Sequence, residues 1–340
     1  MAGIAKYKVF LIHKNTTKYD VTSAVTKLTL NESDGEIAQR VELTLYNKSV
    51  LAYLSGAKML SGIVSIRDRV IIYADDGERN EEVFRGFVWA RGYKSGKKKE
   101  LSVTCYDNLI YFQESEDYKY FSAGYSTKSI CGKICGDWKV TLKYHYKSIT
   151  HPKLPLRGTL ADIFITDLLE EVRKKTGVRY VMRSEKDIVQ IYTVGLNNPV
   201  YKLLRNEGGN TIDTQSNKTM QGMVTRVVIL GKEDKEDRAS IEAAVDGDSY
   251  TFGILQKVLS VSSGTDLAEV KEEAQELIDE KGAPIETFSV TAVDIPWVRK
   301  GDRVYVSAGD MVGYFIVTSI THYAMDKTMI LEAVRHNERY

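Results

Sequence analysis

Residue types that could act in catalysis are present, but they form no recognised catalytic motif. The sequence contains no G-x-S-x-G nucleophile turn, no H-E-x-x-H zinc motif and no G-x-x-x-x-G-K-[ST] phosphate loop. The histidines are scattered, and the close pair His145 and His151 lacks a partner carboxylate on a predicted helix. These patterns do not support serine-hydrolase, zinc-protease or P-loop chemistry.

The cysteines could in principle bind a metal ion. Cys131 and Cys135 lie four residues apart on one face of a short predicted helix, Ser129–Gly136. A zinc site needs two further ligands, and none follows at metal spacing. With Cys105 the count is odd, which favours a reducing compartment without a disulfide framework. We therefore expect buried thiols, no metal site and no cofactor.

Asp302 is a candidate general base, but its context indicates a turn. Gly301-Asp302 stands directly before a predicted strand, where glycine permits the backbone conformation and aspartate caps it. The chain holds 46 acidic residues, so some carboxylates will lie together by chance. Sequence alone cannot distinguish a glycosidase pair from such neighbours. We predict no catalytic residue.

Two segments are candidate interfaces. Lys97, Lys98 and Lys99 flank a turn at Gly96, and they form either a hairpin tip or a contact to an acidic partner or passing nucleic acid. The apolar loop Ile295-Pro296-Trp297 could join a subunit interface, where buried aromatic residues dominate affinity. Alternatively, Trp297 folds onto its own domain. Both alternatives remain open at this point.

Composition limits the class of protein. A chain of 340 residues has room for two or three domains. Its formal net charge of +1 argues against a dedicated nucleic-acid binder. There is no signal-peptide pattern and no apolar run near the ~20 residues that span a bilayer. We expect synthesis in the cytoplasm and no membrane-spanning segment.

The clearest organising feature is a repeat near the two ends of the chain. Asp68-Arg69-Val70 opens three predicted strands in the N-terminal third, and Asp302-Arg303-Val304 opens three predicted strands near the C-terminus. The copies stand much too far apart for a solenoid repeat. Two similar β-domains in one chain explain the pattern better.

The predicted fold class is α+β, mainly β, in three domains. Residues 1–114 form the first β-domain and residues 206–340 the second, which carries a helical insertion at about 264–282 capped by Asp266. Residues 115–205 form a small α+β domain. Its main helix runs from Leu160 to Lys175, with Thr159 as N-cap and Gly177 at its end.

The ordered motifs resemble a known family. The chain is similar to the XkdQ/YqbQ family of phage-like tail proteins, and hence to the central hub of T4-like baseplates and to late-control-type hub proteins. The likeness covers nearly the whole chain, and its specific part is the order and spacing of the motifs. They are Tyr-Asp-Val-Thr at 19–22, Val-Phe-Arg-Gly-Phe-Val at 83–88, Tyr-Asp-Asn-Leu-Ile-Tyr at 106–111, Gly-Asp-Arg-Val at 301–304 and Gly-Tyr-Phe-Ile-Val at 313–317.

The resemblance implies a structural role. Family hubs carry two tail-tube-like antiparallel β-barrels per chain, so a homotrimer presents a pseudo-sixfold ring. Such a ring would join a sixfold tail tube to a threefold central spike in a contractile tail, either of a phage or of an R-type bacteriocin. Further expected partners are other baseplate proteins and the tape measure protein, with nucleic acid only in passage through the lumen. The assembled particle would be released by lysis.

Two other functions deserve a test. A muralytic tail enzyme would use some of the many carboxylates, and a cell-wall-binding module would use Tyr-rich β-domains. Some hub relatives carry a fused hydrolase, but here the sequence ends directly after the last predicted strand, so we expect none. We favour the hub and predict that the chain is not an enzyme.

Overall fold

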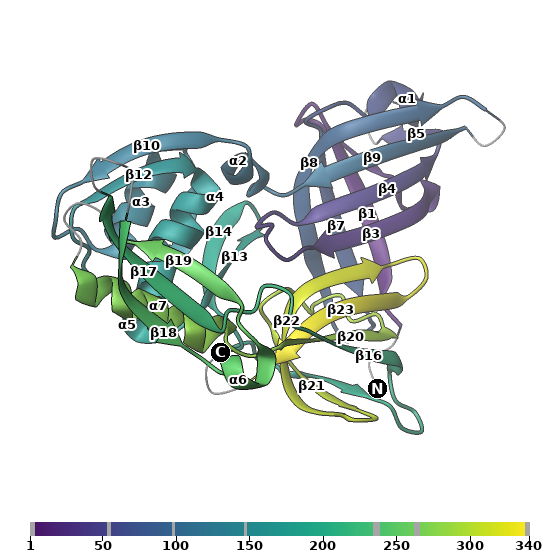
Figure 1. Cartoon of the computed structure of the whole chain (residues 1–340). Coiled ribbons are helices and arrows are strands. Elements are labelled where there is room, and N and C mark those ends of the chain that lie inside the picture. The colour runs from purple at the N-terminus through teal and green to yellow at the C-terminus, as the bar shows by residue number, and fades with distance from the viewer. Residues whose placement is uncertain are drawn as a thin grey trace. The chain divides into compact units, whose positions relative to one another are not determined.

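The computed structural model describes residues 4–52, 56–96, 99–145, 148–233, 239–261 and 266–336. The protein is mainly β, as predicted (Figure 1). Its N-terminal part contains β1 Lys6–His13, β2 Thr17–Asp20, a 3-10 turn at Thr22–Ala24, β3 Val25–Glu32, β4 Arg40–Tyr46, β5 Ser49–Ala52, β6 Gly56–Met59, α1 Leu60–Ile63, β7 Arg69–Asp75, β8 Asn80–Lys94 and β9 Glu100–Tyr106.

Helices appear mainly in the middle of the chain. This region contains α2 Ile110–Gln113, β10 Glu116–Phe121, α3 Thr127–Asp137, β11 Thr141–Tyr144, β12 Leu154–Thr159, α4 Leu160–Asp162, the π-helical segment Ile163–Leu169, α5 Glu170–Thr176, β13 Tyr180–Glu185, β14 Ile188–Thr193 and β15 Tyr201–Leu204.

The C-terminal part returns to β structure. It contains β16 Thr211–Thr219, β17 Arg226–Glu233, β18 Ala239–Asp246, α6 Ser249–Phe252, β19 Gln256–Ser260, α7 Leu267–Lys281, β20 Ile285–Val293, β21 Arg303–Ala308, β22 Met311–Tyr323 and β23 Thr328–Arg335. By internal contacts the chain divides into two units, residues 1–215 with 289–340, and residues 216–288.

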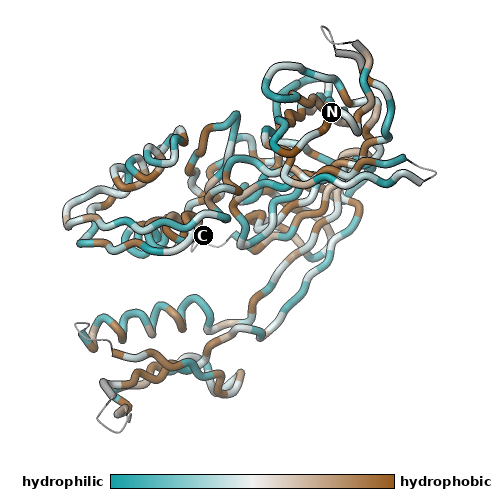
Figure 2. The backbone as a smooth tube through the Cα atoms, turned by 90° about the horizontal axis from the view of Figure 1, so that it is seen from above, coloured by the Kyte–Doolittle hydropathy of each residue, from teal (hydrophilic) through white to brown (hydrophobic). Residues whose placement is uncertain are grey.

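A 13-stranded sheet dominates the first unit. Its main path runs β16-β20-β23-β22-β3-β4-β9-β8-β7-β1-β2, and β21 pairs with both β15 and β22. Alternate residues of β4, namely Val41, Leu43 and Leu45, are buried, which confirms the predicted one-sided strand. Figure 2 shows this alternation of hydrophobic and hydrophilic residues along the strands.

Two halves of this sheet repeat one order of strands. The first half, β3, β4, β7, β8 and β9, is ordered 7-8-9-4-3 in space. The second half, β16, β20, β21, β22 and β23, is ordered 21-22-23-20-16. When β3, β4, β7, β8 and β9 are matched in chain order to β16, β20, β21, β22 and β23, the two halves have the same spatial order of strands. The duplication predicted from the Asp-Arg-Val motifs is therefore present in the fold.

The duplicated Asp-Arg-Val motif forms one turn twice. The Asp68 carboxylate accepts the N–H of Ser65 at 2.9 Å, and the Asp302 carboxylate accepts that of Arg299 at 2.9 Å. In each copy the aspartate carbonyl accepts a valine N–H from the neighbouring strand, Val88 at 2.8 Å and Val317 at 2.9 Å. The turn reading of Asp302 is confirmed.

The residue before each aspartate has a left-handed backbone. Its φ is 68° at Arg67 and 86° at Gly301. A Cβ at Gly301 would also lie 2.7 Å from Cγ1 of Val181, so glycine is needed there for space as well as for conformation. The first copy tolerates an arginine at the equivalent position at the expense of a less favourable φ.

Both halves also share a β-bulge. The β8–β9 register shifts between Val88 and Ala90, and the β22–β23 register shifts between Val317 and Ser319. Each bulge follows directly on the valine that pairs with the duplicated turn. A bulge bends the strand and turns its continuation away from its first neighbour. Beyond the bulge, β8 and β22 can therefore meet different strands.

The two halves form one continuous sheet. Beyond its bulge β22 leaves β21 and pairs with β3, with Ile320 opposite Glu32 and Tyr323 opposite Thr29. The sequence predicted two antiparallel β-barrel domains, but no closed barrel is found in the described residues, where β2 and β16 are the two ends of the path. The backbone groups of β22 past the bulge need partners, and β3 supplies them.

The middle region contains the predicted α+β elements. β10 pairs with β12, and a second sheet has the order β11-β14-β13. The helix predicted from Leu160 to Lys175 is present as α4, the π segment and α5. Thr159 caps it by accepting the N–H of Asp162 at 3.1 Å, and Gly177 ends it with a φ of 72°. Both predicted end residues are confirmed.

The second unit is larger than the predicted helical insertion. Helix α7 does follow Asp266, which accepts the N–H of Ala268 at 3.3 Å; residues 264 and 265 lie outside the described residues. The helix packs on a separate sheet, β18-β17-β19, through a shared apolar core. The strand predicted at Gly222–Leu230 belongs to this sheet. Its alternation predicts a strand but cannot specify which sheet it joins.

None of the described helices is both long and apolar enough to span a bilayer.

The duplicated turn makes a stability prediction. Asp68→Ala and Asp302→Ala should each destabilise the protein, because each removes the acceptor of partly buried N–H donors, which costs up to about 1–3 kcal/mol per donor. Asp310→Ala, at an exposed turn, is the matched control and should change stability little. Thermal melts of the purified variants measure this. Wild-type melting of either turn variant would contradict an equivalent role for the two aspartates.

Candidate functional site: the seam between the halves

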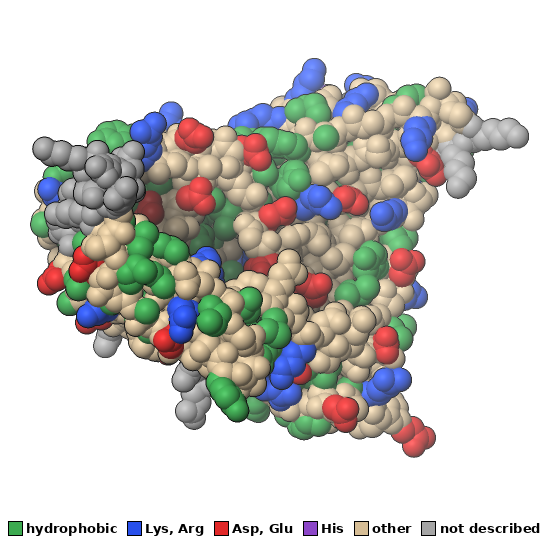
Figure 3. Space-filling model, viewed as in Figure 1, with side chains coloured by type: hydrophobic (Ala, Val, Ile, Leu, Met, Phe, Trp, Pro, Cys, Tyr) green, Lys and Arg blue, Asp and Glu red, His purple; other side chains and the backbone are tan. Residues whose placement is uncertain are grey.

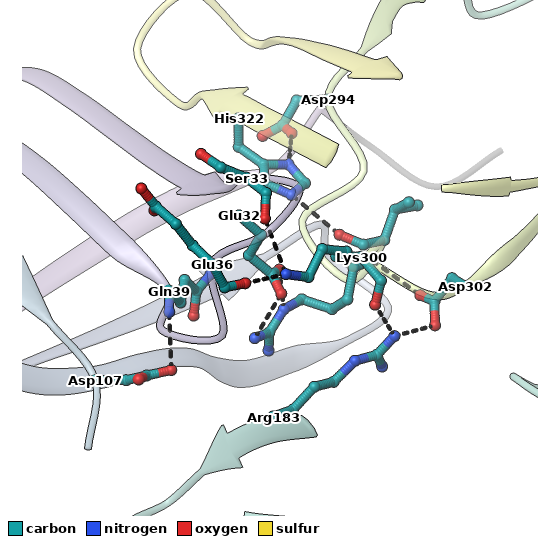
Figure 4. A network of polar contacts seen from close by, with 12 residues as sticks. Glu32, Ser33, Glu36, Gln39, Asp107, Arg183, Asp294, Lys300, Asp302 and His322 are labelled. Carbon is teal, nitrogen blue, oxygen red and sulfur yellow. Dashed lines mark hydrogen bonds and ion pairs between the residues drawn. The ribbon is translucent and has the colours of Figure 1, made fainter. Parts of the chain in front are cut away.

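The two halves meet along a stretch that we call the seam. It comprises the end of β3, the loop 33–39, the loop 294–302 and residues 319–323 of β22 (Figure 4). Arg183, from β13, also reaches this place. Buried charged side chains gather here, and burial of charge is stable only when partners are supplied. The seam is the main concentration of such groups in the described residues.

A buried ion pair connects the halves directly. Arg299 donates from Nε and Nη2 to the Glu32 carboxylate, whose side chain is 6% exposed. Burial opposes ionisation of Glu32, but Arg299, together with Arg183 and Lys300, outweighs it and holds the pKa of Glu32 below its usual value. The same carboxylate raises the pKa of Arg299 against the effect of burial. Both groups therefore stay charged.

Lys300 fixes the loop of the first half. Its ammonium donates to the carbonyl oxygen of Ser33 at 2.9 Å and to that of Glu36. Figure 4 shows the side chain extending toward this loop. Burial lowers the pKa of Lys300, and the neighbouring carboxylates of Glu32, Asp34 and Glu36 oppose that shift. Two charge-assisted hydrogen bonds from Lys300 thus hold this loop.

The duplicated aspartates hold different neighbours in the two copies. Arg183 donates from Nη2 to Asp302 at 2.7 Å and to the carbonyl oxygen of Lys300 at 2.5 Å. Asp68 instead accepts the backbone N–H of Lys14 at 3.0 Å and lies 2.9 Å from Nδ1 of His13. One turn therefore anchors the middle region and the other anchors the N-terminal hairpin.

A third contact crosses the seam at Asp294. Its carboxylate lies 2.7 Å from Nδ1 of His322, and it also accepts the hydroxyl hydrogen of Tyr7. Nε2 of His322 lies 3.1 Å from the carbonyl oxygen of Val298. Both ring nitrogens of His322 therefore lie within hydrogen-bond distance of an oxygen atom. Burial, and then Asp294, raises the pKa of Tyr7 and keeps its hydroxyl protonated.

Asp107 is a buried carboxyl group whose raised pKa makes the stability of the protein depend on pH. It is buried where β9 ends, and burial raises its pKa to about 7 although it accepts the N–H groups of Gln39 and Leu109. Carboxyl groups with such a pKa occur among general acids and bases. Here the side chain is 1% exposed and its oxygens face backbone donors. The arrangement has the geometry of a structural cap.

The predicted loop residues Ile295, Pro296 and Trp297 lie within the seam. Pro296 is buried, and the half-buried ring of Trp297 packs against the core of the first half. The Arg79 guanidinium lies 4.6 Å from the centre of that ring. Trp297 Nε1 is buried and finds no hydrogen-bond partner among the described residues. Ile295 is half-buried in the same loop. An interface role for this loop stays a prediction.

The predicted lysine cluster is described only in part. Lys97 and Lys98 lie outside the described residues. Lys99 is exposed, has a φ of 44°, and accepts the N–H of Asn47 at 2.9 Å. Lys327 has the equivalent place in the second half, with a φ of 58° and a bond from Asp294 N–H at 3.0 Å. Lys99 is thus one of a pair of duplicated turn residues.

The cysteine thiols, which could act as nucleophiles or metal ligands, are buried. Cys105, Cys131 and Cys135 are free and buried, as predicted, and burial raises the pKa of each, for Cys135 to about 12. Within the described ranges, no group of three or more His, Cys, Asp or Glu residues could hold a metal ion. On the face in Figure 3, acidic and basic side chains are interspersed.

Sequence reasoning found one residue of the seam network and missed the rest. Asp302 was found through the repeated motif. Glu32, Arg299 and Arg183 come from three distant segments, and no spacing signal connects them. The apolar loop before Asp302 was the one clue that this part of the second half is buried.

Comparison with known proteins agrees with this fold. The YqbQ-like family profile matches residues 28–333. The chain is 27% identical over 268 residues to XkdQ of the phage-like element PBSX of Bacillus subtilis, covering 76% of this chain and 80% of that protein. A tail protein from Neisseria meningitidis MC58 is similar in structure, with a TM-score of 0.67, 13% identity and 97% of each chain covered. The 43 kDa tail protein of prophage MuSo2 from Shewanella oneidensis is also similar in structure, with a TM-score of 0.67 and 13% identity. The match covers 97% of this chain and 98% of that protein.

The buried ion pair should be sensitive to removal of one partner. Arg299→Leu leaves Glu32 buried without its counter-ion, which costs on the order of 3–5 kcal/mol. Glu42→Gln is a control for loss of charge, because Glu42 pairs with Lys27 and Arg40 at the surface. Urea unfolding of both variants measures the difference. The double variant Glu32→Leu/Arg299→Leu should recover much of the loss; equal, additive losses would contradict a coupled pair.

Asp107 predicts a pH dependence of stability. Its folded-state pKa of about 7 lies above the ordinary 3.8, so the native state binds the proton more tightly than the unfolded chain. This contribution is fully present below pH ~4, and it decreases by at most about 1.4 kcal/mol per pH unit as the pH rises to ~7. Asp107→Asn, which does not titrate, should therefore gain stability relative to wild type between pH 5 and pH 8. The melting temperatures of both proteins are measured from pH 5 to pH 8. A difference between them that does not change with pH would contradict the raised pKa of Asp107.

Proposed function

Because this chain belongs to the YqbQ-like family, we propose that it is the structural hub of a contractile-tail baseplate. Three copies would form a ring in which the two halves of each chain occupy six similar positions. A ring of this kind fits a sixfold tail tube on one side and a threefold spike on the other. The particle would be a phage tail or an R-type bacteriocin.

The observation that carries this proposal is the duplicated half. The two copies agree in strand order, in the Asp-Arg-Val turn and in the position of the bulge. A chain built from two such copies can meet a sixfold partner with three subunits, because each half offers a similar surface. The tail proteins that share this fold support placing this chain in a phage tail or a tail-like particle.

The further assignments belong to the same proposal. Residues 1–114 and 206–340 would supply the tube-like parts, and residues 115–205 a peripheral α+β domain. The expected partners are the tail tube protein, the central spike, other baseplate proteins and the tape measure protein. Synthesis in the cytoplasm and release by lysis follow from that role. No observation on the seam favours catalysis over this structural role.

Reconstruction by electron microscopy tests the proposal. The protein is mixed with candidate tail tube and spike proteins from the same genome, and the complex is imaged. We expect a ring with threefold symmetry and an almost sixfold outline. A chain that stays monomeric and joins neither partner would contradict the hub. Clearing of purified cell wall by the chain alone would instead favour the muralytic alternative.

A further inference from the structure

The β22–β3 ladder shows how one half binds another. Beyond its bulge, β22 runs antiparallel to β3 over Ile320–Tyr323. Asn31 and Thr321, which are opposite each other, also share a side-chain hydrogen bond of 2.7 Å. The pairing buries Ile320 and His322. The edge of the first half is thus covered by the long strand of the second.

In the described part of the chain, no strand covers the outer edge of the equivalent stretch of β8. Residues Ala90–Lys94 follow the same bulge as Ser319–Tyr323 and keep the same register to their inner neighbour: Tyr93 is opposite Leu101 in one copy, and His322 is opposite Met329 in the other. β7 pairs with β8 only as far as Phe87. All residues from Trp89 to Lys94 are exposed.

β16 has the place in the second half that β3 has in the first. β3 pairs with β4 and, on its other edge, with β22. β16 pairs with β20, and in the described part of the chain it ends the path of the sheet. Past the buried Thr211, this strand is mostly exposed, including an Ile212 side chain that is 51% exposed. One edge of β16 is open.

We propose that the open edge of β8 at Ala90–Lys94 pairs antiparallel with the open edge of β16 around Gln215 in a second copy of this chain. β22 covers Thr29–Glu32, which is the second half of β3, and Gln215 has the equivalent place in β16. This contact between copies repeats the β22–β3 contact within the chain. The inference rests on the proposed function, because the ring supplies the second copy, but it names the contact that would close that ring.

The two edges are suited to each other. Exposed edges with free N–H and C=O groups are templates for further pairing. The β8 edge carries Lys94 and β16 carries Asp213, so these two charges are opposite, while Arg91 already donates to the carbonyl oxygens of Val64 and Ser61 in its own chain. The ring of Tyr93, which is 44% exposed, would bury apolar surface on pairing.

The arrangement repeats in one direction. Each copy offers one β8 edge and one β16 edge, so the contact is head-to-tail. A head-to-tail contact closes into a ring when the rotation per step allows it. If the step between copies equals the step between halves, three copies with six halves close the ring. The β8 edge and the β16 edge of each copy are sufficient to close the ring.

Cysteine cross-linking within the assembled complex tests the contact. Tyr93→Cys is combined in turn with Asp213→Cys, Thr214→Cys, Gln215→Cys and Ser216→Cys, which span the registers next to the one that repeats the pairing of His322 with Leu30. The native cysteines are buried and should stay reduced. After mild oxidation we expect covalent dimers and trimers on a non-reducing gel.

Two control variants make the result decisive. Asn31→Cys/Thr321→Cys should form a disulfide within one chain, because these residues are opposite each other across the seam. Tyr46→Cys with Gln215→Cys should give no adduct, since Tyr46 is exposed on β4 away from the β8 edge. A threefold ring with the seam disulfide formed, but no adduct from any Tyr93 pair, would overturn this inference and leave the hub intact.

If no ring assembles, the hub itself is contradicted. The same pairs are then oxidised in the purified chain at high concentration. Adducts between chains from a Tyr93 pair would still support the strand contact. Their absence, with the seam disulfide formed, would overturn it as well.

Discussion

The structure depends on one constraint: the backbone N–H and C=O groups at the edge of a strand need hydrogen-bond partners. β22 is long enough to pair with β21 before its bulge and with β3 after it. The bulge makes this possible, because it bends the strand from one neighbour to the next. Without that change of partner, the two copies of the repeated unit would be separate sheets with two further open edges.

The buried charges make this arrangement specific. A ladder of backbone bonds tolerates a slip of register, whereas Arg299 meets Glu32, and Lys300 meets the loop carbonyl oxygens, only in one alignment. Buried ion pairs are weak sources of net stability, but they disfavour alternatives in which one partner is left unpaired. The seam therefore fixes which half lies beside which, and β3 supplies both the strand and the carboxylate.

Much of the local structure could be predicted from the sequence. The Asp-Arg-Val repeat identified the duplicated turn, and Thr159 and Gly177 marked the ends of the main helix, since caps and turns depend on neighbouring residues. The continuous sheet could not be predicted. Alternation in β22 or β17 specifies a strand and its buried face, but not its partner. The contact of Glu32 with Arg299 joins positions far apart in the chain, and single residues at such separations leave no pattern.

The central claim is that the two halves are equivalent units, and that the ring completes for β8 what the chain already completes for β22. Amide hydrogen exchange, read by mass spectrometry on the free chain and on the assembled particle, tests this most directly. In the free chain, Ala90–Lys94 should exchange much faster than Ser319–Tyr323. In the particle, both segments should exchange slowly. Continued fast exchange of Ala90–Lys94 in the particle would contradict the account.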